Sequence, residues 1–239
     1  MTELIEIPTT RSIFNLYMET SNNLDFYKKH LDLSEYRATQ IDLILEKHPD
    51  FRENESFENL YTQLEFNGLL IISVLDLSLI SREFFISKKP WENIFYAKQA
   101  YLVIYETINC YNKHTKNLKY ILSKLAENLN NEFQNISKTI RKFKKDYNFL
   151  SEFSDIRNKV VGHIDDNFRI YCSTLKTIDI PKTQLMLKDF ILILTSLQNF
   201  SSNLLKEYGK LQQGNLKLID EQHAEIMDKI NNTLNSNNR

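Results

Sequence analysis

Residues 130–161 read NNEFQNISKTIRKFKKDYNFLSEFSDIRNKVV, a stretch that contains neither glycine nor proline. Because these two residues most often interrupt regular structure, the stretch predicts one long helix or two abutting helices. The whole chain has the same character, since its 239 residues include only four glycines and four prolines. All-β folds and folds with a parallel sheet use many more of both in their turns. The sequence therefore predicts an all-α, up-and-down bundle of long helices.

Apolar residues recur at helical spacing on both sides of this stretch. We expect one helix to begin near residue 13 and another at residue 34. The second should end at His48, because Pro49 pushes the residue before it out of the α region. Ser56 is the expected cap of a helix to about residue 87, and Pro90 and Pro181 suit the first turns of two more. The helix from Pro90 should run to about residue 111 or on to 125, and a shorter helix is expected over 167–176.

These patterns divide the chain into three parts. Residues 1–55 should form an N-terminal helical extension packed on the core, residues 56–210 a helical bundle, and residues 211–239 a linker and an amphipathic tail helix. The linker is expected between Gly209 and Gly214, and the tail helix is defined by Ile219, Ile226 and Ile230. Packing on its own bundle is the default for such a helix, although it could also bind an antitoxin or a second subunit.

Composition and charge exclude several classes of protein. The net charge of −1 excludes nucleic-acid binding through overall charge alone. Cys110 and Cys172 are too few for a disulfide framework, and the first residues are acidic where a signal peptide is basic. The most apolar run, from Leu69 to Ile80, contains Asp76 and is shorter than the roughly 20 residues that span a bilayer. We therefore expect a cytoplasmic protein that does not enter a membrane.

Most signatures of catalysis or cofactor binding are absent from the sequence. It contains no Walker loop, no GxGxxG, no HExxH and no CxxC. Cys110 and His114 are four residues apart, which on a helix could place two metal ligands side by side. No further cysteine or histidine lies nearby to complete the site, so we interpret the pair as a coincidence on a helix face. We expect no metal and no cofactor.

One segment, residues 155–166, carries a chemical pattern: DIRNKVVGHIDD. Asn158 directly follows Arg157, and five residues separate Arg157 from His163, which follows Gly162. This segment resembles the signature of the HEPN superfamily, in which four to six residues separate an arginine from a histidine and a polar residue, often asparagine, follows the arginine. The order of apolar helices before and after the segment is also similar to the HEPN bundle, over roughly residues 56–210.

The spacing of the arginine and the histidine requires a break in the helix. Six steps along an α-helix rotate a side chain by about 600°, which leaves Arg157 and His163 some 120° apart. Glycine costs about 1 kcal/mol in mid-helix but adopts the left-handed conformation easily after a helix end. We therefore expect Gly162 to end the helix and let His163 fold back towards Arg157.

The resemblance implies a metal-independent endoribonuclease that acts as a homodimer, with the motifs of two subunits forming one cleft. Arg157 would bind the scissile phosphate and stabilise its developing charge. His163 would act as general base on the 2′-hydroxyl or as general acid to the leaving oxygen, and Asn158 would orient the phosphate or His163. This route leaves 2′,3′-cyclic phosphate ends, so DNA should not be cut. The resemblance further implies a toxin or abortive-infection effector in antiviral defence, with an antitoxin or defence protein as a partner.

The sequence also allows alternatives to a catalytic role for this motif. Some HEPN toxins carry a tyrosine two residues after the histidine that a partner enzyme modifies, and Asp165 stands at that position here. Arg157 could instead pair with Asp155 or Asp165, with His163 only capping the turn. The chain would then be a non-catalytic HEPN-like module that binds RNA, a nucleotide or a protein partner. A third interpretation is a helical scaffold whose tail mediates assembly.

Four basic residues precede the motif at steps of three and one along the helix: Lys138, Arg141, Lys142 and Lys145. They could form a strip that binds the RNA backbone, or simply the solvated face of a helix.

Asp76 lies within an apolar run, where an unpaired carboxylate is costly to bury. It is a candidate to position Arg157, Lys98 or Arg82 by an ion pair, without itself contacting the substrate. Three tyrosines on the helix after Pro90 are interpreted as core and interface aromatics rather than base-stacking platforms: Tyr101, Tyr105 and Tyr111.

Overall fold

The computed structural model describes the backbone of residues 10–125, 127–161 and 167–237, and the side chains of residues 24–50, 53–125, 127–160 and 167–213. All regular structure in these ranges is helical, and no strand occurs in them. The prediction of an all-α fold is confirmed. No helix in the described ranges combines the length and the hydropathy that a membrane span requires.

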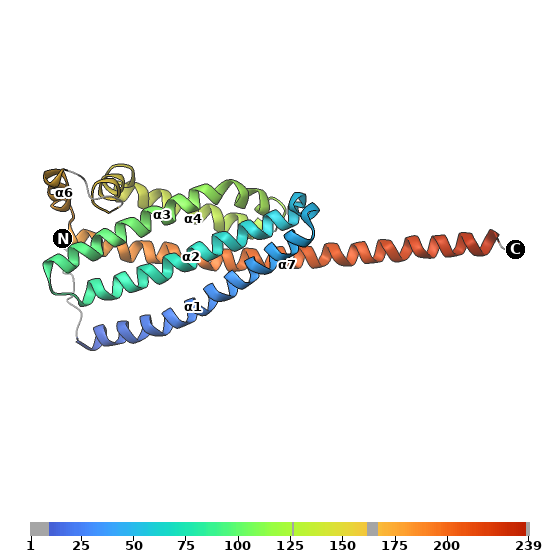
Figure 1. Cartoon of the computed structure of the whole chain (residues 1–239), viewed down its shortest axis with the longest axis horizontal. Helices are drawn as coiled ribbons and strands as arrows, with labels where there is room; N and C mark the ends of the chain where they lie inside the picture. The colour runs from blue at the N-terminus through green and yellow to red at the C-terminus, as the bar shows by residue number, and fades with distance from the viewer. Residues whose placement is uncertain (1–9, 126, 162–166, 238–239) are drawn as a thin grey trace.

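Five long helices make up most of the molecule (Figure 1). They are α1 (Thr10–Lys47), α2 (Glu55–Ile86), α3 (Pro90–Leu122), α4 (Glu127–Asp146) and α7 (Ile180–Asn237). Helices α2, α3, α4 and α7 surround one core, and α1 lies along the outside of α2. The core is rich in aromatic side chains that are almost fully buried, among them Phe66, Tyr101, Phe133, Phe153, Phe190 and Phe200.

The ends of the first helices follow local sequence signals. Helix α1 ends at Lys47, and a 3₁₀ turn, η1, runs from Pro49 to Glu53. The cap of α2 is Asn54, whose Oδ1 accepts a hydrogen bond of 2.9 Å from the backbone N–H of Ser56. The cap therefore lies two residues before Ser56, the residue predicted to cap the helix. Helix α3 has Pro90 in its first turn, as expected.

Two expected boundaries are wrong. Residues 10–47 form one helix, α1, where two were predicted. Helix α7 is continuous through Gly209 and Gly214, so the expected linker is helical and the tail continues a helix of the bundle (Figure 1). Glycine weakens a helix by about 1 kcal/mol but leaves every backbone hydrogen bond in place, and no proline occurs there to break it. The segment also keeps a tertiary contact, because Ser56 Oγ donates to Gln212 Oε1 at 3.4 Å.

The glycine-free stretch after residue 130 breaks into two abutting parts. Helix α4 ends at Asp146, and Asn148 has the positive φ of 49° that is common only in glycine and asparagine. Next come a π-helical turn η2 (Phe149–Phe153), a short α5 (Ser154–Ile156) and a second π-helical turn η3 (Arg157–Val161). Helix α6 (Phe168–Leu175) begins after Asn167, whose side chain caps it. An asparagine thus makes the turn for which the sequence offers no glycine.

Candidate functional site

The described residues of the candidate site lie on the second of the two π-helical turns. Arg157 and Asn158 begin η3, which follows η2 after only one short turn of α-helix. π-Helix makes up well under 1% of residues in proteins, and single turns of it are frequent at functional sites. The rotation of 100° per residue assumed from the sequence does not hold through η3, because the hydrogen bonds there span five residues. Gly162, His163 and Asp165 lie outside the described residues, so the approach of His163 to Arg157 stays a prediction.

Arg157 is held by side chains of α3 and of its own turn. Its Nε lies 3.5 Å from Glu106 Oε1, and one terminal nitrogen donates to Asn158 Oδ1 at 3.1 Å. The guanidinium carbon is 5.9 Å from the centre of the Tyr105 ring. The Arg157 side chain is 37% exposed and Glu106 is 53% exposed. The guanidinium is therefore positioned and still reachable from solvent.

The Nε atom of Arg157 is buried and makes no hydrogen bond within the described part of the chain. At 3.5 Å, the contact with Glu106 is an ion pair without hydrogen-bond geometry. The alternative pairing of Arg157 with Asp155 is not found, because Asp155 pairs with Lys159 at 3.1 Å. Among the described residues, the donor capacity of Arg157 is thus only partly used.

Aromatic stacking fixes the wall behind Arg157. The rings of Tyr105 and Phe149 stack with centres 5.4 Å apart at an angle of 17°, and Phe149 in turn contacts Phe153 at 5.0 Å. Tyr105 is therefore packed between the core and the candidate site. This agrees with its interpretation as a packing residue, and it adds a contact with Arg157 that the sequence did not indicate.

A polar junction anchors the π-helical turns to the bundle. Glu152, on η2, accepts a hydrogen bond of 2.7 Å from the hydroxyl of Tyr101 on α3 and one of 2.6 Å from Lys182 Nζ on α7. Its side chain is only 19% exposed. Burial, followed by the hydrogen bond to Glu152, holds the pKa of Tyr101 far above its ordinary value. One carboxylate thus ties together three elements around the motif.

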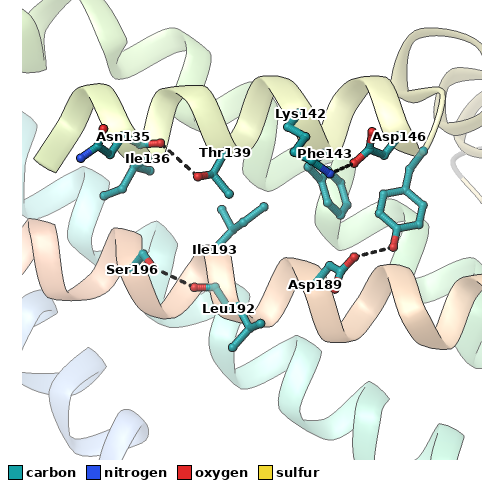
Figure 2. A pocket seen from close by; sticks show the side chains of 11 residues that line it. Asn135, Ile136, Thr139, Lys142, Phe143, Asp146, Asp189, Leu192, Ile193 and Ser196 are labelled. Carbon is teal, nitrogen blue, oxygen red and sulfur yellow. Dashed lines mark hydrogen bonds and ion pairs between the residues drawn. The ribbon is translucent and has the colours of Figure 1, made fainter.

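The predicted basic strip is on the exposed face of α4. Lys138, Arg141 and Lys145 form no ion pair with any described residue, whereas Lys142 is bonded to Asp146. Lys142 and Asp146 stand at the rim of a groove between α4 and α7, as Figure 2 shows. Three cations of the strip therefore have no ion-pair partner among the described residues, and the fourth, Lys142, is partly neutralised by Asp146.

The groove in Figure 2 has a volume of about 430 Å³ and a floor of Ile136, Phe143 and Ile193. Tyr147 closes one end by donating a hydrogen bond of 2.6 Å to Asp189. Neither Arg157 nor Asn158 lines this groove, so it is separate from the candidate site.

The structure gives Asp76 no hydrogen bond or ion pair with any residue that it describes. The three expected partners are engaged elsewhere: Arg157 with Glu106, Lys98 with the Tyr171 hydroxyl at 2.9 Å, and Arg82 with Glu83 at 2.9 Å. Asp76 is exposed on α2 between the half-exposed side chains of Ile72 and Leu79. Partial burial raises the pKa of its carboxyl group. The prediction that Asp76 positions Arg157 is therefore wrong, because Arg157 pairs with Glu106 instead.

Cys110 and His114 both belong to α3, but no group of three potential metal ligands forms among the described residues. His114 is buried, with its ring centre 5.7 Å from that of Phe66. Burial lowers the pKa of His114 and raises that of Cys110 to about 11. Both residues are packing residues in this arrangement.

Glu106, Glu152 and Lys182 could not be predicted from the sequence. None of them lies in a motif, and Glu106 and Arg157 are brought together from distant parts of the chain only by the packing of η3 on α3.

No protein-family model, curated protein or solved structure matches this chain. The motif thus remains a resemblance in one short segment, set in an all-helical fold.

Proposed function

We propose that the chain is a metal-independent endoribonuclease of HEPN type that cuts RNA through a 2′,3′-cyclic phosphate. The observation that carries the proposal is the state of Arg157. Its guanidinium is half-exposed and is oriented by Glu106, Asn158 and Tyr105. It is located on an unusual backbone turn, and five residues separate it from the next histidine in the sequence.

The reaction would proceed by attack of the RNA 2′-oxygen on the adjacent phosphorus. His163 takes the 2′-hydroxyl proton as the new P–O bond forms, or gives a proton to the 5′-oxygen as its bond to phosphorus breaks. Arg157 offsets the negative charge that builds on the phosphate oxygens, and Asn158 orients the phosphate or the imidazole. No metal ion or cofactor takes part in this scheme, and DNA, which lacks the 2′-hydroxyl, is not cut.

RNA would bind to three basic residues on the exposed face of α4. Lys138, Arg141 and Lys145 are exposed and free of ion pairs with described residues, so they can neutralise backbone phosphates without first losing a partner. They compensate locally for the nearly neutral net charge of the chain.

The enzyme would act as a homodimer through an apolar face of α2 and α3. We propose that this face is made up of five exposed apolar side chains of these adjacent helices: Leu69, Ile72, Leu79, Trp91 and Phe95. The exposed Asp76 lies on α2 between Ile72 and Leu79. Phe95 and Glu106 are eleven residues apart, or about three helical turns, so they share a side of α3. Because Glu106 contacts Arg157, a second copy bound at this face would bring its own Arg157 near the first.

The biological role that follows from the resemblance is a cytoplasmic toxin or abortive-infection effector in antiviral defence. An antitoxin or defence protein would restrain or trigger it. Asp165 stands where some HEPN toxins carry a modified tyrosine, so control by that modification is not proposed.

One observation favours a second candidate function, a non-catalytic HEPN-like module that binds RNA, a nucleotide or a protein partner. Glu106 already neutralises Arg157 in the absence of substrate, as expected of an arginine with a structural role. The pair is half-exposed, however, and exposed ion pairs are worth at most about 1 kcal/mol, which a phosphate can displace.

The decisive experiment incubates purified protein with structured and unstructured RNA in EDTA. Wild type is compared with His163→Ala, Arg157→Ala and the matched control Arg169→Ala, which removes an exposed arginine from α6. The proposal expects cyclic-phosphate ends from wild type and the control, and none from the other two. If all four proteins are folded, dimeric and equally inert, the binding module is the better description.

A further inference from the structure

A pocket at the closed end of the α1–α2 hairpin has a lining that the proposed function does not use. The hairpin closes at the end of the bundle from which α7 projects (Figure 1). The pocket has a volume of about 490 Å³, within the range of small-molecule sites. Its lining consists of three carboxylates, two aromatic rings, a leucine and a threonine, and includes no described basic residue. From this lining we propose that the pocket binds a linear aliphatic polyamine, at a site separate from Arg157.

The pocket concentrates negative charge. Asp42 and Glu46 on α1 and Glu58 on α2 are exposed, and they form no ion pair with any described residue. The nearby Glu55, by contrast, is paired with Lys124 and does not line the pocket. A concave surface lined by charges of one sign attracts ligands of the opposite sign. The pocket therefore selects a cation.

The two carboxylates of α1 weaken their own helix. Asp42 and Glu46 are four residues apart, so two like charges lie on one face of the helix. Glu46 is also in the last turn of α1, where the helix dipole disfavours a negative charge. A bound cation would remove both costs.

Side chains of the two helices face the same space. The negative charge of Asp42 on α1 is the largest cause that raises the pKa of Tyr61 on α2, ahead of burial and the charge of Glu65. The carboxylates of α1 therefore act on the same volume as the aromatic rings of α2.

The arrangement suits a ligand whose positive charges are separated by apolar groups. No three potential metal ligands converge on one point within the described part of the chain. Asp42 and Glu46 are about 6 Å apart along the helix axis, close to the spacing of two ammonium groups joined by four methylenes. Leu45, Phe57 and Tyr61 supply apolar surface for the methylenes, and the two rings can also attract an ammonium group. Charged and apolar groups thus occur together in the lining, as they do along a polyamine.

Thr62 gives the pocket a buried hydroxyl without a partner. The residue is 8% exposed and lines the pocket, and its hydroxyl makes no hydrogen bond with any described residue. Threonines inside helices can bond to the carbonyl four residues earlier, as Thr39, Thr107 and Thr115 do at 3.0, 2.6 and 2.8 Å. The hydroxyl of Thr62 remains free to accept a hydrogen bond, and an ammonium group is such a donor. This hydroxyl points to a ligand independently of the carboxylates.

The test is isothermal titration of the full chain, freed of RNA by nuclease treatment, with putrescine, spermidine and spermine. At least one amine should bind at low salt with a Kd below about 1 mM. The double variant Asp42→Asn with Glu46→Gln should weaken that binding at least about tenfold, because it removes two charge-assisted contacts. Thr62→Val keeps the shape of the side chain and should weaken binding at least about twofold. The matched control is Asp25→Asn with Glu35→Gln, which removes two exposed carboxylates from α1 outside the pocket and should change nothing.

Four results would overturn the proposal. They are no binding of any of the three amines, equal binding by a folded Asp42→Asn, Glu46→Gln protein, equal binding by Thr62→Val, and Mg²⁺ or a trilysine peptide binding as tightly as the best amine. None of these measurements involves Arg157 or RNA cleavage. A chain that binds a polyamine but cuts no RNA therefore keeps this site and loses the proposed activity, and the reverse result separates the two in the other direction.

Discussion

Glu106 Oε1 lies 3.5 Å from Arg157 Nε, across the contact between α3 and the π-helical turn η3. The two residues come from distant parts of the chain, and the pair fixes which way the guanidinium faces. Because both side chains are about half exposed, the pair contributes at most about 1 kcal/mol to stability. If Arg157 binds phosphate as proposed, Glu106 both orients the guanidinium and competes with the phosphate for it.

Glu106→Gln should therefore change binding and turnover in opposite directions. Loss of the carboxylate removes the competitor, so KM for RNA should fall about two- to fivefold at low salt, the equivalent of up to about 1 kcal/mol. Loss of orientation should lower kcat. Steady-state cleavage kinetics measure both, with Glu127→Gln, an exposed glutamate on α4, as the control. A variant with both constants unchanged would mean that Glu106 neither competes for nor positions Arg157.

Glu152→Ala should destabilise the fold by about 2 kcal/mol or more. The change leaves the Tyr101 hydroxyl and the Lys182 ammonium without the acceptor that they share, in a place that is mostly buried. Urea unfolding followed by circular dichroism gives the free energy of unfolding, and Glu127→Ala provides the exposed control. Glu152→Gln keeps one acceptor oxygen and should recover part of the loss. A Glu152→Ala protein as stable as the control would show that the junction does not hold η2 in place.

Stability should fall in mild acid because of His114. Burial lowers its pKa in the folded state, so the unfolded chain binds a proton more readily. The stabilisation is complete above the unfolded pKa of about 6.5 and is lost as the pH falls from there towards the folded value, at no more than about 1.4 kcal/mol per pH unit. Denaturant unfolding between pH 7.5 and 5 should show this slope in wild type and in the exposed control His30→Gln. His114→Gln should flatten it, and an equal slope in that variant would assign the effect to other groups.

Lys138, Arg141 and Lys145 on α4 should contribute to RNA affinity through salt-dependent contacts. A double variant, Arg141→Gln with Lys145→Gln, removes two of them, so the slope of log affinity against log salt should decrease by about 1.4 for single-stranded RNA. Fluorescence anisotropy with a labelled oligonucleotide measures the slope, and His163→Ala in every protein prevents cleavage. The matched control is Lys29→Gln with Lys47→Gln on α1. Equal slopes in both double variants would identify the α4 residues as an ordinary solvated face.

The sequence indicates the helices well and the candidate site poorly, for physical reasons that particular residues illustrate. Pro49 and Pro90 act on the backbone next to them, so the C-terminal end of α1 and the start of α3 could be predicted. Asn148 adopts its left-handed turn without a glycine or proline to signal it, and Gly209 and Gly214 are tolerated inside α7.

The neighbours of Arg157 are a different problem. Glu106 meets Arg157, and Glu152 meets Tyr101 and Lys182, only through the packing of separate elements. Contacts of this kind leave no periodic or local trace in a single sequence. The motif could therefore be located from its residues, whereas the groups that hold it could not.

Phe95→Glu should separate a dimer and thereby show whether two motifs are needed. Phe95 is 48% exposed on the side of α3 that also carries Glu106, and a carboxylate there cannot be buried without a large cost. Light scattering after size-exclusion chromatography should change from dimer to monomer, and cleavage should be lost while the salt-dependent binding through α4 persists. The control is Leu192→Glu, which places the same charge on an exposed apolar residue of α7 at the groove of Figure 2. If the Phe95 variant is monomeric and still cuts RNA, one chain holds a complete site, and Arg157 then acts without a second copy of itself.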